Sequence, residues 1–190
     1  MVATDLTMRS AATAILVLAV GILAGCAAPT SSSNAPDGDY PDVSLTESKS
    51  NVQLLRNSAK SRIATEVIES SADTDTSVAC LSTAEDPDGT IRQWLSTTEV
   101  NLVRWHAWRV DDVADILIDT FADQSWNIAE IAGEHAEAAT LLTNGNGLAE
   151  IQVEAVGTDD DSAATIFVTV SGPCVKTDGA DSDEVTDLGT

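Results

Sequence analysis

The sequence is poor in the residue types that carry most enzyme chemistry. Two histidines and three cysteines stand among its 190 residues, and nine lysines and arginines face 31 aspartates and glutamates. It contains no Gly-x-Ser-x-Gly elbow, glycine-rich phosphate loop or His-Glu-x-x-His motif. Its formal net charge of −22 repels nucleic acid and other polyanions. We therefore expect no nucleic-acid partner, no phosphate-binding role and no cofactor.

Candidate metal sites are incomplete in the same way. The two histidines, His106 and His135, leave a Cys/His zinc site short of ligands. Three acidic clusters offer oxygen ligands for calcium: Asp86-x-Asp88-Gly89, Asp159-Asp160-Asp161 and Asp181-x-Asp183. None of them continues to the distal bidentate glutamate of a calcium-binding loop. Turn formation and solvation explain these clusters better, and we expect no metal ion.

The chain has one long apolar run, and it lies at the N-terminus. Residues 11–24 are shorter than the roughly 20 residues that span a bilayer, which is typical of the core of a signal peptide. The run ends in Leu23-Ala24-Gly25-Cys26, the pattern of a bacterial lipobox. We expect cleavage before Cys26, so that residues 1–25 are a lipoprotein signal peptide.

Lipid on Cys26 would anchor the protein to a membrane. Two or three acyl chains on one cysteine hold stably, so the mature chain is expected on the outer face of the cytoplasmic membrane. The alternative is a buried cysteine in a membrane-inserted segment. A start at Met8 rather than Met1 gives a more ordinary signal, because Arg9 then follows the initiator without Asp5.

Composition divides the mature chain into three parts. Residues 26–43 are rich in Ala, Ser, Pro and Asp and predict a flexible tether behind the lipid. Residues 44–176 are enough for a single domain with one core. Residues 177–190 carry five acidic side chains and little to bury, which predicts a disordered acidic tail.

Two cysteines remain inside the domain. Cys80 and Cys174 predict a disulfide bond, since an exported domain meets an oxidising environment. The bond would close a loop of about 95 residues and stabilise the fold by roughly 4 to 5 kcal/mol in the chain-entropy model, less any native strain. Two separate buried thiols are the alternative.

Two helices are predicted in the domain. Ser44 and Glu47 form a capping box that opens a helix over 45–71, with apolar residues recurring at threes, fours and sevens. A second helix begins at Asp111 or Asp112, either of which can cap it. Its expected core face consists of Val113, Ile116, Leu117 and Phe121.

The remaining segments read as strands. The predicted ranges are 78–82, 91–104, 126–131, 138–143, 148–156 and 164–170. The run Asn-Gly-Asn-Gly at 144–147 predicts a hairpin turn, although residues 129–142 are rich enough in Ala and Glu to form a helix instead. The predicted fold class is α+β, with two helices on one face of a mainly antiparallel sheet of four to six strands.

Several of these features occur together in one known group. The lipobox, polar tether, long first helix, cysteine-containing strand, Arg92-Gln93-Trp94 run, Trp126 after the second helix, hairpin and closing Gly172-Pro173-Cys174 resemble small uncharacterised lipoproteins of actinobacteria. The resemblance covers most of the mature chain. It implies a location and a fold, with no established activity or catalytic residues.

Two classes of function remain open. Trp105 and Trp108 lie between a predicted strand and helix, where they would form a binding surface or else cover the helix end. A non-catalytic binding module for an envelope protein or small ligand is the preferred interpretation. An envelope hydrolase with carboxylates and a histidine in a cleft is the alternative. Because the binding module is preferred, enzyme activity is not expected.

A basic stripe on the first predicted helix offers a further contact. Lys49, Arg56 and Lys60 fall on one side of it in an otherwise acidic chain. They either face anionic lipid or, as we prefer, pair with the domain's own acids.

Overall fold

The computed structural model describes residues 38–157 and 163–188, without the side chains of four of them: Ala107, Trp108, Asp187 and Leu188. The predicted signal peptide, Cys26 and the Asp159–Asp161 cluster lie outside the described residues. Within the described ranges, no helix combines the length and the apolar character needed to cross a bilayer.

Helices and strands follow one another in a mixed order. Two helices lie in the first part of the domain and a short one at its end: α1 (Leu45–Lys60), α2 (Val110–Ala122) and α3 (Asp183–Leu188). Two 3-10 turns join them to strands: η1 (Thr65–Val67) and η2 (Arg104–Arg109). The strands are β1 (Ile68–Ala79), β2 (Ile91–Leu102), β3 (Asn127–Ala132), β4 (Ala138–Thr143), β5 (Glu150–Gly157), β6 (Ala164–Ser171) and β7 (Val175–Lys176).

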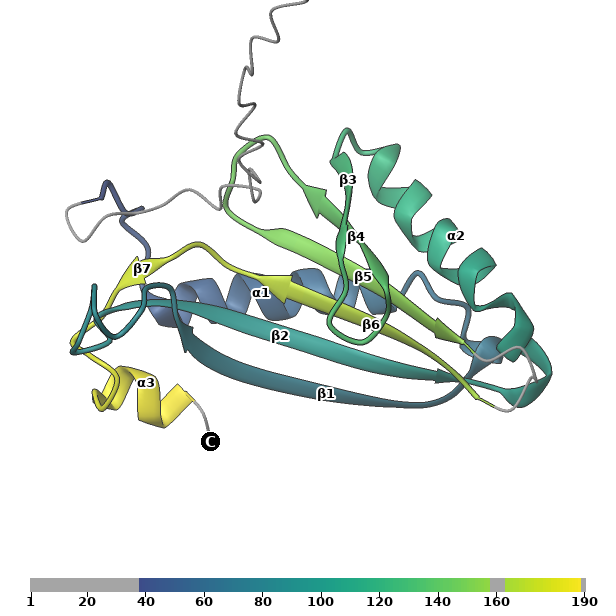
Figure 1. The fold of residues 1–190 in the computed structure, drawn as a ribbon, viewed down its shortest axis with the longest axis horizontal. Coiled ribbons are helices and arrows are strands. Elements are labelled where there is room, and N and C mark those ends of the chain that lie inside the picture. The colour runs from purple at the N-terminus through teal and green to yellow at the C-terminus, as the bar shows by residue number, and fades with distance from the viewer. Residues whose placement is uncertain (1–37, 158–162, 189–190) are drawn as a thin grey trace, which may run out of the picture. The chain divides into compact units, whose positions relative to one another are not determined.

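The strands form one sheet, with α1 and α2 packed against it (Figure 1). The order is β1-β2-β6-β5-β4-β3, all neighbours are antiparallel, and the short β7 pairs with β2. Helix α1 packs on β2 and β6, while α2 packs mainly on β5. The predicted α+β class is confirmed. Its range of four to six strands was too low, because the described sheet has seven.

The core lies between the sheet and the two helices. Along β2 every second residue from Trp94 to Leu102 is buried, including Val100. In β5, where alternation of core and solvent-facing residues was expected, Ile151 and Val153 are buried as expected, but Glu154, expected on the solvent face, is buried too. The apolar residues among these join apolar side chains of α1 and α2 in a single cluster, so both helices cover the same face.

The first helix is shorter than predicted. Ser44 caps it as expected, accepting a hydrogen bond from the Glu47 amide at 3.1 Å. However, it ends at Lys60 instead of residue 71. The segment after η1 is rich in Ser, Thr and Asp, which are unfavourable in a helix interior, and it pairs with β2 as the long strand β1.

The second helix differs at its start. It begins at Val110, and neither Asp111 nor Asp112 caps it, because η2 leads directly into its first turn. Both aspartates instead lie in that turn, where they complement the helix dipole. Ile116, expected in the core, is 59% exposed, and Ala114 takes the buried position.

Residues 138–157 settle the alternative between helix and hairpin. They form the antiparallel pair β4–β5 around the Asn-Gly-Asn-Gly turn, and Gly147 has the positive φ of 65° that such turns require. The first residues of the alternative helix, 129–132, belong to strand β3 instead. The predicted hairpin is therefore confirmed.

The domain extends past both predicted ends. Before residue 44, Tyr40 lies under the Lys176 ammonium at 5.4 Å, and Val43 packs on the core. After residue 176, the expected disordered tail is wrong for the part described. Val185 of α3 packs on the core, and the Glu184 carboxylate accepts a hydrogen bond from the Leu45 amide at 3.0 Å.

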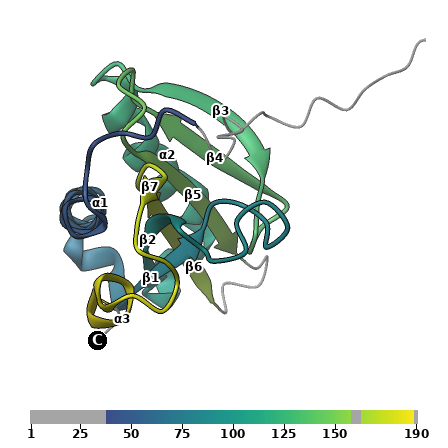
Figure 2. The same cartoon turned by 90° about the vertical axis from the view of Figure 1, so that its left-hand side faces the viewer.

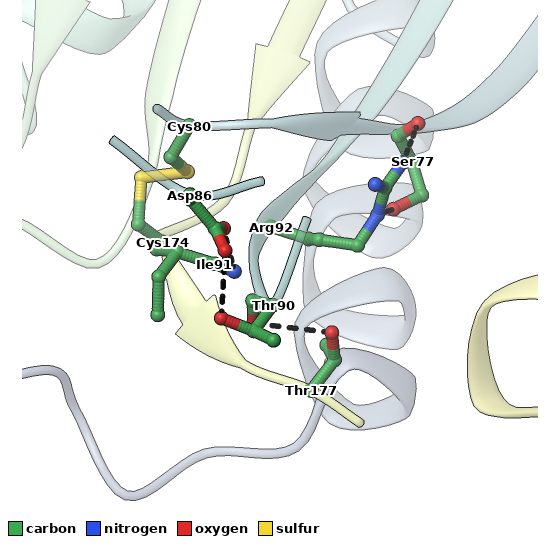
Figure 3. The surroundings of a disulfide bond; sticks show 8 residues. All are labelled: Ser77, Cys80, Asp86, Thr90, Ile91, Arg92, Cys174 and Thr177. Atoms are coloured by element: carbon green, nitrogen blue, oxygen red, sulfur yellow. Dashed lines mark hydrogen bonds between the residues drawn. A yellow bond between two sulfur atoms is a disulfide. The ribbon is translucent and has the colours of Figure 1, made fainter. Parts of the chain in front are cut away.

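The predicted disulfide is present (Figure 3). It joins Cys80, directly after β1, to Cys174, directly before β7. Beside it the Asp86 carboxylate accepts hydrogen bonds from the Ile91 amide at 2.7 Å and the Thr90 hydroxyl at 2.9 Å. The bond and this turn hold the ends of β1, β2 and β7 together.

Candidate functional site

The expected aromatic surface is described in part. Trp105 lies in η2, 65% exposed, with its ring centroid 3.6 Å from that of His106. The side chain of Trp108 lies outside the described part, so its contribution stays a prediction. No carboxylate contact of the His106 ring is found among the described residues, and the structure gives no support to His106 as a hydrolytic base.

The second histidine, His135, helps to hold the loop between β3 and β4 in place. His135 lies between β3 and β4 and stacks on Phe167 of β6, with ring centroids 4.0 Å apart. The amides of His135 and Ala136 donate to the Glu154 carboxylate at 2.7 and 3.0 Å. Glu154 is only 3% exposed. Burial alone would raise its pKa, but these amides, Gln152 and the charge of His135 lower it.

The carboxylate and histidine therefore meet in a contact that closes a loop. The Glu154 carboxylate accepts hydrogen bonds from two backbone amides of the loop, and the His135 ring stacks on Phe167. Such a carboxylate holds the loop against the sheet rather than accepting a proton from a ligand.

The basic stripe of α1 pairs internally, as preferred. Arg56 is buried and its guanidinium lies 3.2 Å from the Asp75 carboxylate, while the Lys60 ammonium lies 3.1 Å from Asp73. The Lys49 ammonium sits 4.7 Å above the Trp94 ring. These charges face the domain's own side chains.

A cleft that the sequence did not reveal lies between α2 and the strands β3, β4 and β5. Its volume is about 330 Å³. Asp111 and Asp115 line it from α2, and Glu130 and Glu137 line it from β3 and the turn before β4. Thr140 and small or apolar side chains form the rest of its wall: Ala114, Ile118, Ala136, Ala138, Ala139, Val153 and Ala155.

The register explains how these residues meet. Asp111, Ala114, Asp115 and Ile118 recur at threes and fours, which places them on one side of α2. Across the gap, Glu130 of β3 pairs with Thr140 of β4, which also lines the cleft. Figure 2 shows β3 and β4 beside α2, at the edge of the sheet away from α1.

The cleft is strongly acidic. Four carboxylates line it, no lysine or arginine does, and none of the four has an ion-pair partner among the described residues. By contrast, Asp112 on the same helix pairs with Arg109 at 3.1 Å. The cleft thus combines negative charge that has no ion-pair partner among the described residues with a wall of mostly small side chains.

Metal ligation is not indicated in the described ranges. No group of three or more His, Cys, Asp or Glu side chains there is arranged to hold an ion. Asp86 serves the turn beside the disulfide, as preferred for that cluster.

The cleft was invisible in the sequence because its carboxylates come from segments that meet only in the folded sheet. The helical spacing of Asp111 and Asp115 was the one available signal, and it reads equally as a solvated face. No protein-family model matches the chain, and no curated protein matches it.

Proposed function

We propose that the protein is a lipid-anchored binding module on the outer face of the cytoplasmic membrane, and that its acidic cleft takes a cationic ligand. The observation that carries the binding role is the cleft of about 330 Å³, whose four carboxylates have no ion-pair partner in the described part of the chain. Concave sites in which a few polar groups converge are typical of ligand binding.

The chemistry of the cleft favours an organic cation. Carboxylates on two facing walls attract a ligand with separated positive charges, and the small side chains between them leave room for the chain that links those charges. The net charge of −22 raises the local concentration of any cation near the surface. Because His135 and Glu154 are engaged in holding the loop between β3 and β4, binding is favoured over catalysis.

The anchor rests on the lipobox that ends at Cys26, and the disulfide supports an oxidising compartment. Intact-mass measurement of protein from the membrane fraction tests both. We expect a chain that starts at Cys26, carries two or three acyl chains, and is two hydrogens lighter than after reduction. An unmodified full-length mass would overturn the anchor, and Cys26→Ser provides the unlipidated control.

Calorimetric titration of the purified protein with spermidine tests the cleft. The Asp115→Asn/Glu130→Gln variant is expected to weaken spermidine binding by roughly tenfold, because each lost ion pair at a partly enclosed site contributes about 0.5 to 1 kcal/mol. The matched variant Asp88→Asn/Glu69→Gln removes the same charge from exposed positions at the β1 side of the sheet, away from the cleft. Equal weakening by both variants would show diffuse attraction and refute the site.

A further inference from the structure

We infer that the cleft's partner is an extended basic segment of another polypeptide, which adds as a strand to the free edge of β3 and points alternate basic side chains into the cleft. This inference rests on the proposed function and names the partner class for the same site. The two ideas are separable, since a small polyamine needs only the cleft, whereas a strand needs the edge as well.

The edge of β3 is open within the described structure. β3 is the last strand of the sheet and pairs only with β4 (Figure 1). Five of its six residues are exposed, Ile131 being half-buried. Its outward backbone N–H and C=O groups are therefore available to another strand, and its sequence contains no proline or lysine to blunt the edge.

The opposite edge, β1, is built differently. Asp73 and Asp75 of β1 point to the helix side, where Arg56 and Lys60 hold them, and the pairing with β2 is irregular near Ile68. Charges that point inward and irregular pairing are devices that discourage strand addition. β3 carries one such inward charge, Glu130, but it has no ion-pair partner among the described residues, so this edge favours a basic strand over a neutral or acidic one.

The free edge and the cleft share one face. Ile128 and Glu130 are opposite Leu142 and Thr140 of β4, so their side chains lie on the side of α2. An added strand would set every second side chain on that same side, about 6.8 Å apart. Those side chains would reach the carboxylates of Asp111 and Asp115, and Ile128, 50% exposed, would contact their aliphatic stems.

A second copy of this chain is a poor occupant. An antiparallel pairing of two β3 strands centred on Ala129 sets Glu130 of each strand opposite Ile128, and centring on Glu130 sets the two glutamates opposite each other. Either arrangement brings two acidic clefts together without a cation between them. Charge complementarity favours a basic partner strand.

The test uses two labelled peptides of equal composition. In acetyl-Val-Lys-Thr-Lys-Val-Lys-Thr-amide all lysines share one face of a strand, and in acetyl-Lys-Lys-Thr-Val-Lys-Thr-Val-amide they occupy both. Fluorescence anisotropy with the purified protein should show roughly tenfold tighter binding of the alternating peptide. N-methylation of its internal amides should abolish binding, and hydrogen exchange should slow at 127–132.

The outcomes separate the two proposals. Equal binding of both peptides, with no protection of β3, would overturn strand addition, while spermidine binding that needs Asp115 and Glu130 would leave the proposed function standing. Protection at β1 in place of β3 would also overturn the inference. So would a dimer in sedimentation that Glu130→Lys strengthens, because it would identify a second copy as the occupant.

Discussion

Gly172 determines how closely the end of β6 approaches α1. Its amide donates to the Trp94 carbonyl at 2.9 Å, and a Cβ at this position would collide with the Ser48 hydroxyl and lie 3.1 Å from a Val52 methyl. We expect Gly172→Ala to lower the free energy of unfolding by about 1 to 3 kcal/mol, as overpacking does in other cores. Urea unfolding measures the loss.

Two matched variants make this prediction specific. Gly145→Ala should change stability little, because a Cβ there meets nothing within 4 Å. Adding Ser48→Ala to Gly172→Ala should recover part of the loss, since it removes the colliding oxygen. If the single and double variants were equally unstable, the close contact would not be the cause.

Asp75 makes the fold sensitive to acid. Partial burial alone would raise its pKa, but the hydrogen bond from the Trp94 indole and the charge of Arg56 contribute to a pKa below the usual value. A carboxyl group whose pKa is lower in the folded state stabilises the protein above its unfolded pKa of about 3.9 and loses that effect as the pH falls through the folded value.

Melting temperature against pH tests this expectation. The wild-type melting temperature should fall below about pH 4. In Asp75→Asn the melting temperature should already be lower at pH 7 and decline less on acidification. Asp119→Asn, an exposed change on α2, should leave the curve parallel to wild type. A parallel curve for Asp75→Asn would contradict the assignment.

At the scale of elements, α3 completes the N-terminus of α1. The Glu184 carboxylate accepts from the Leu45 amide, while the Ser44 hydroxyl serves that of Glu47. A carboxylate at a helix N-terminus also complements the dipole. We expect Glu184→Ala to destabilise the protein by about 1 kcal/mol in thermal unfolding, whereas Asp183→Ala, with an exposed side chain, should have little effect. Equal effects would point to loss of α3 itself.

Sequence periodicity was sufficient for elements whose pattern is local. The alternation in β5 and the glycines of the hairpin predicted those strands, and the two domain cysteines predicted the disulfide. It failed where a tertiary contact decides. The end of α1 at Lys60 depends on β1 pairing with β2, and α3 depends on the orphan amides of α1.

Little of the candidate site could be predicted from the sequence. Trp105, which the sequence placed either on a binding surface or over a helix end, is 65% exposed. The cleft could not be predicted, because Asp115 and Glu130 are brought together only by the packing of α2 on β5 and the position of β3 at the edge. Charge counts along the chain do not distinguish such convergence from a solvated surface.

On the scale of the whole molecule, the disulfide joins residues 94 positions apart. Cross-linking so long a loop restricts the unfolded chain strongly, so Cys80→Ala/Cys174→Ala should lower the free energy of unfolding by about 4 kcal/mol. Denaturant titration measures it. The oxidised wild type after incubation with reductant should approach the double variant, and an unchanged midpoint would show that the bond contributes nothing.

The place of β6 in the sheet governs when this chain can fold. β6 is nearly the last strand to be synthesised, yet it lies between β2 and β5. Until residue 171 has been synthesised, no strand connects β2 to β5. The core between the helices and the sheet therefore cannot close before then. Long-range pairing of this kind folds slowly. A growing chain that stays open to its end is suited to threading through a narrow pore before it folds.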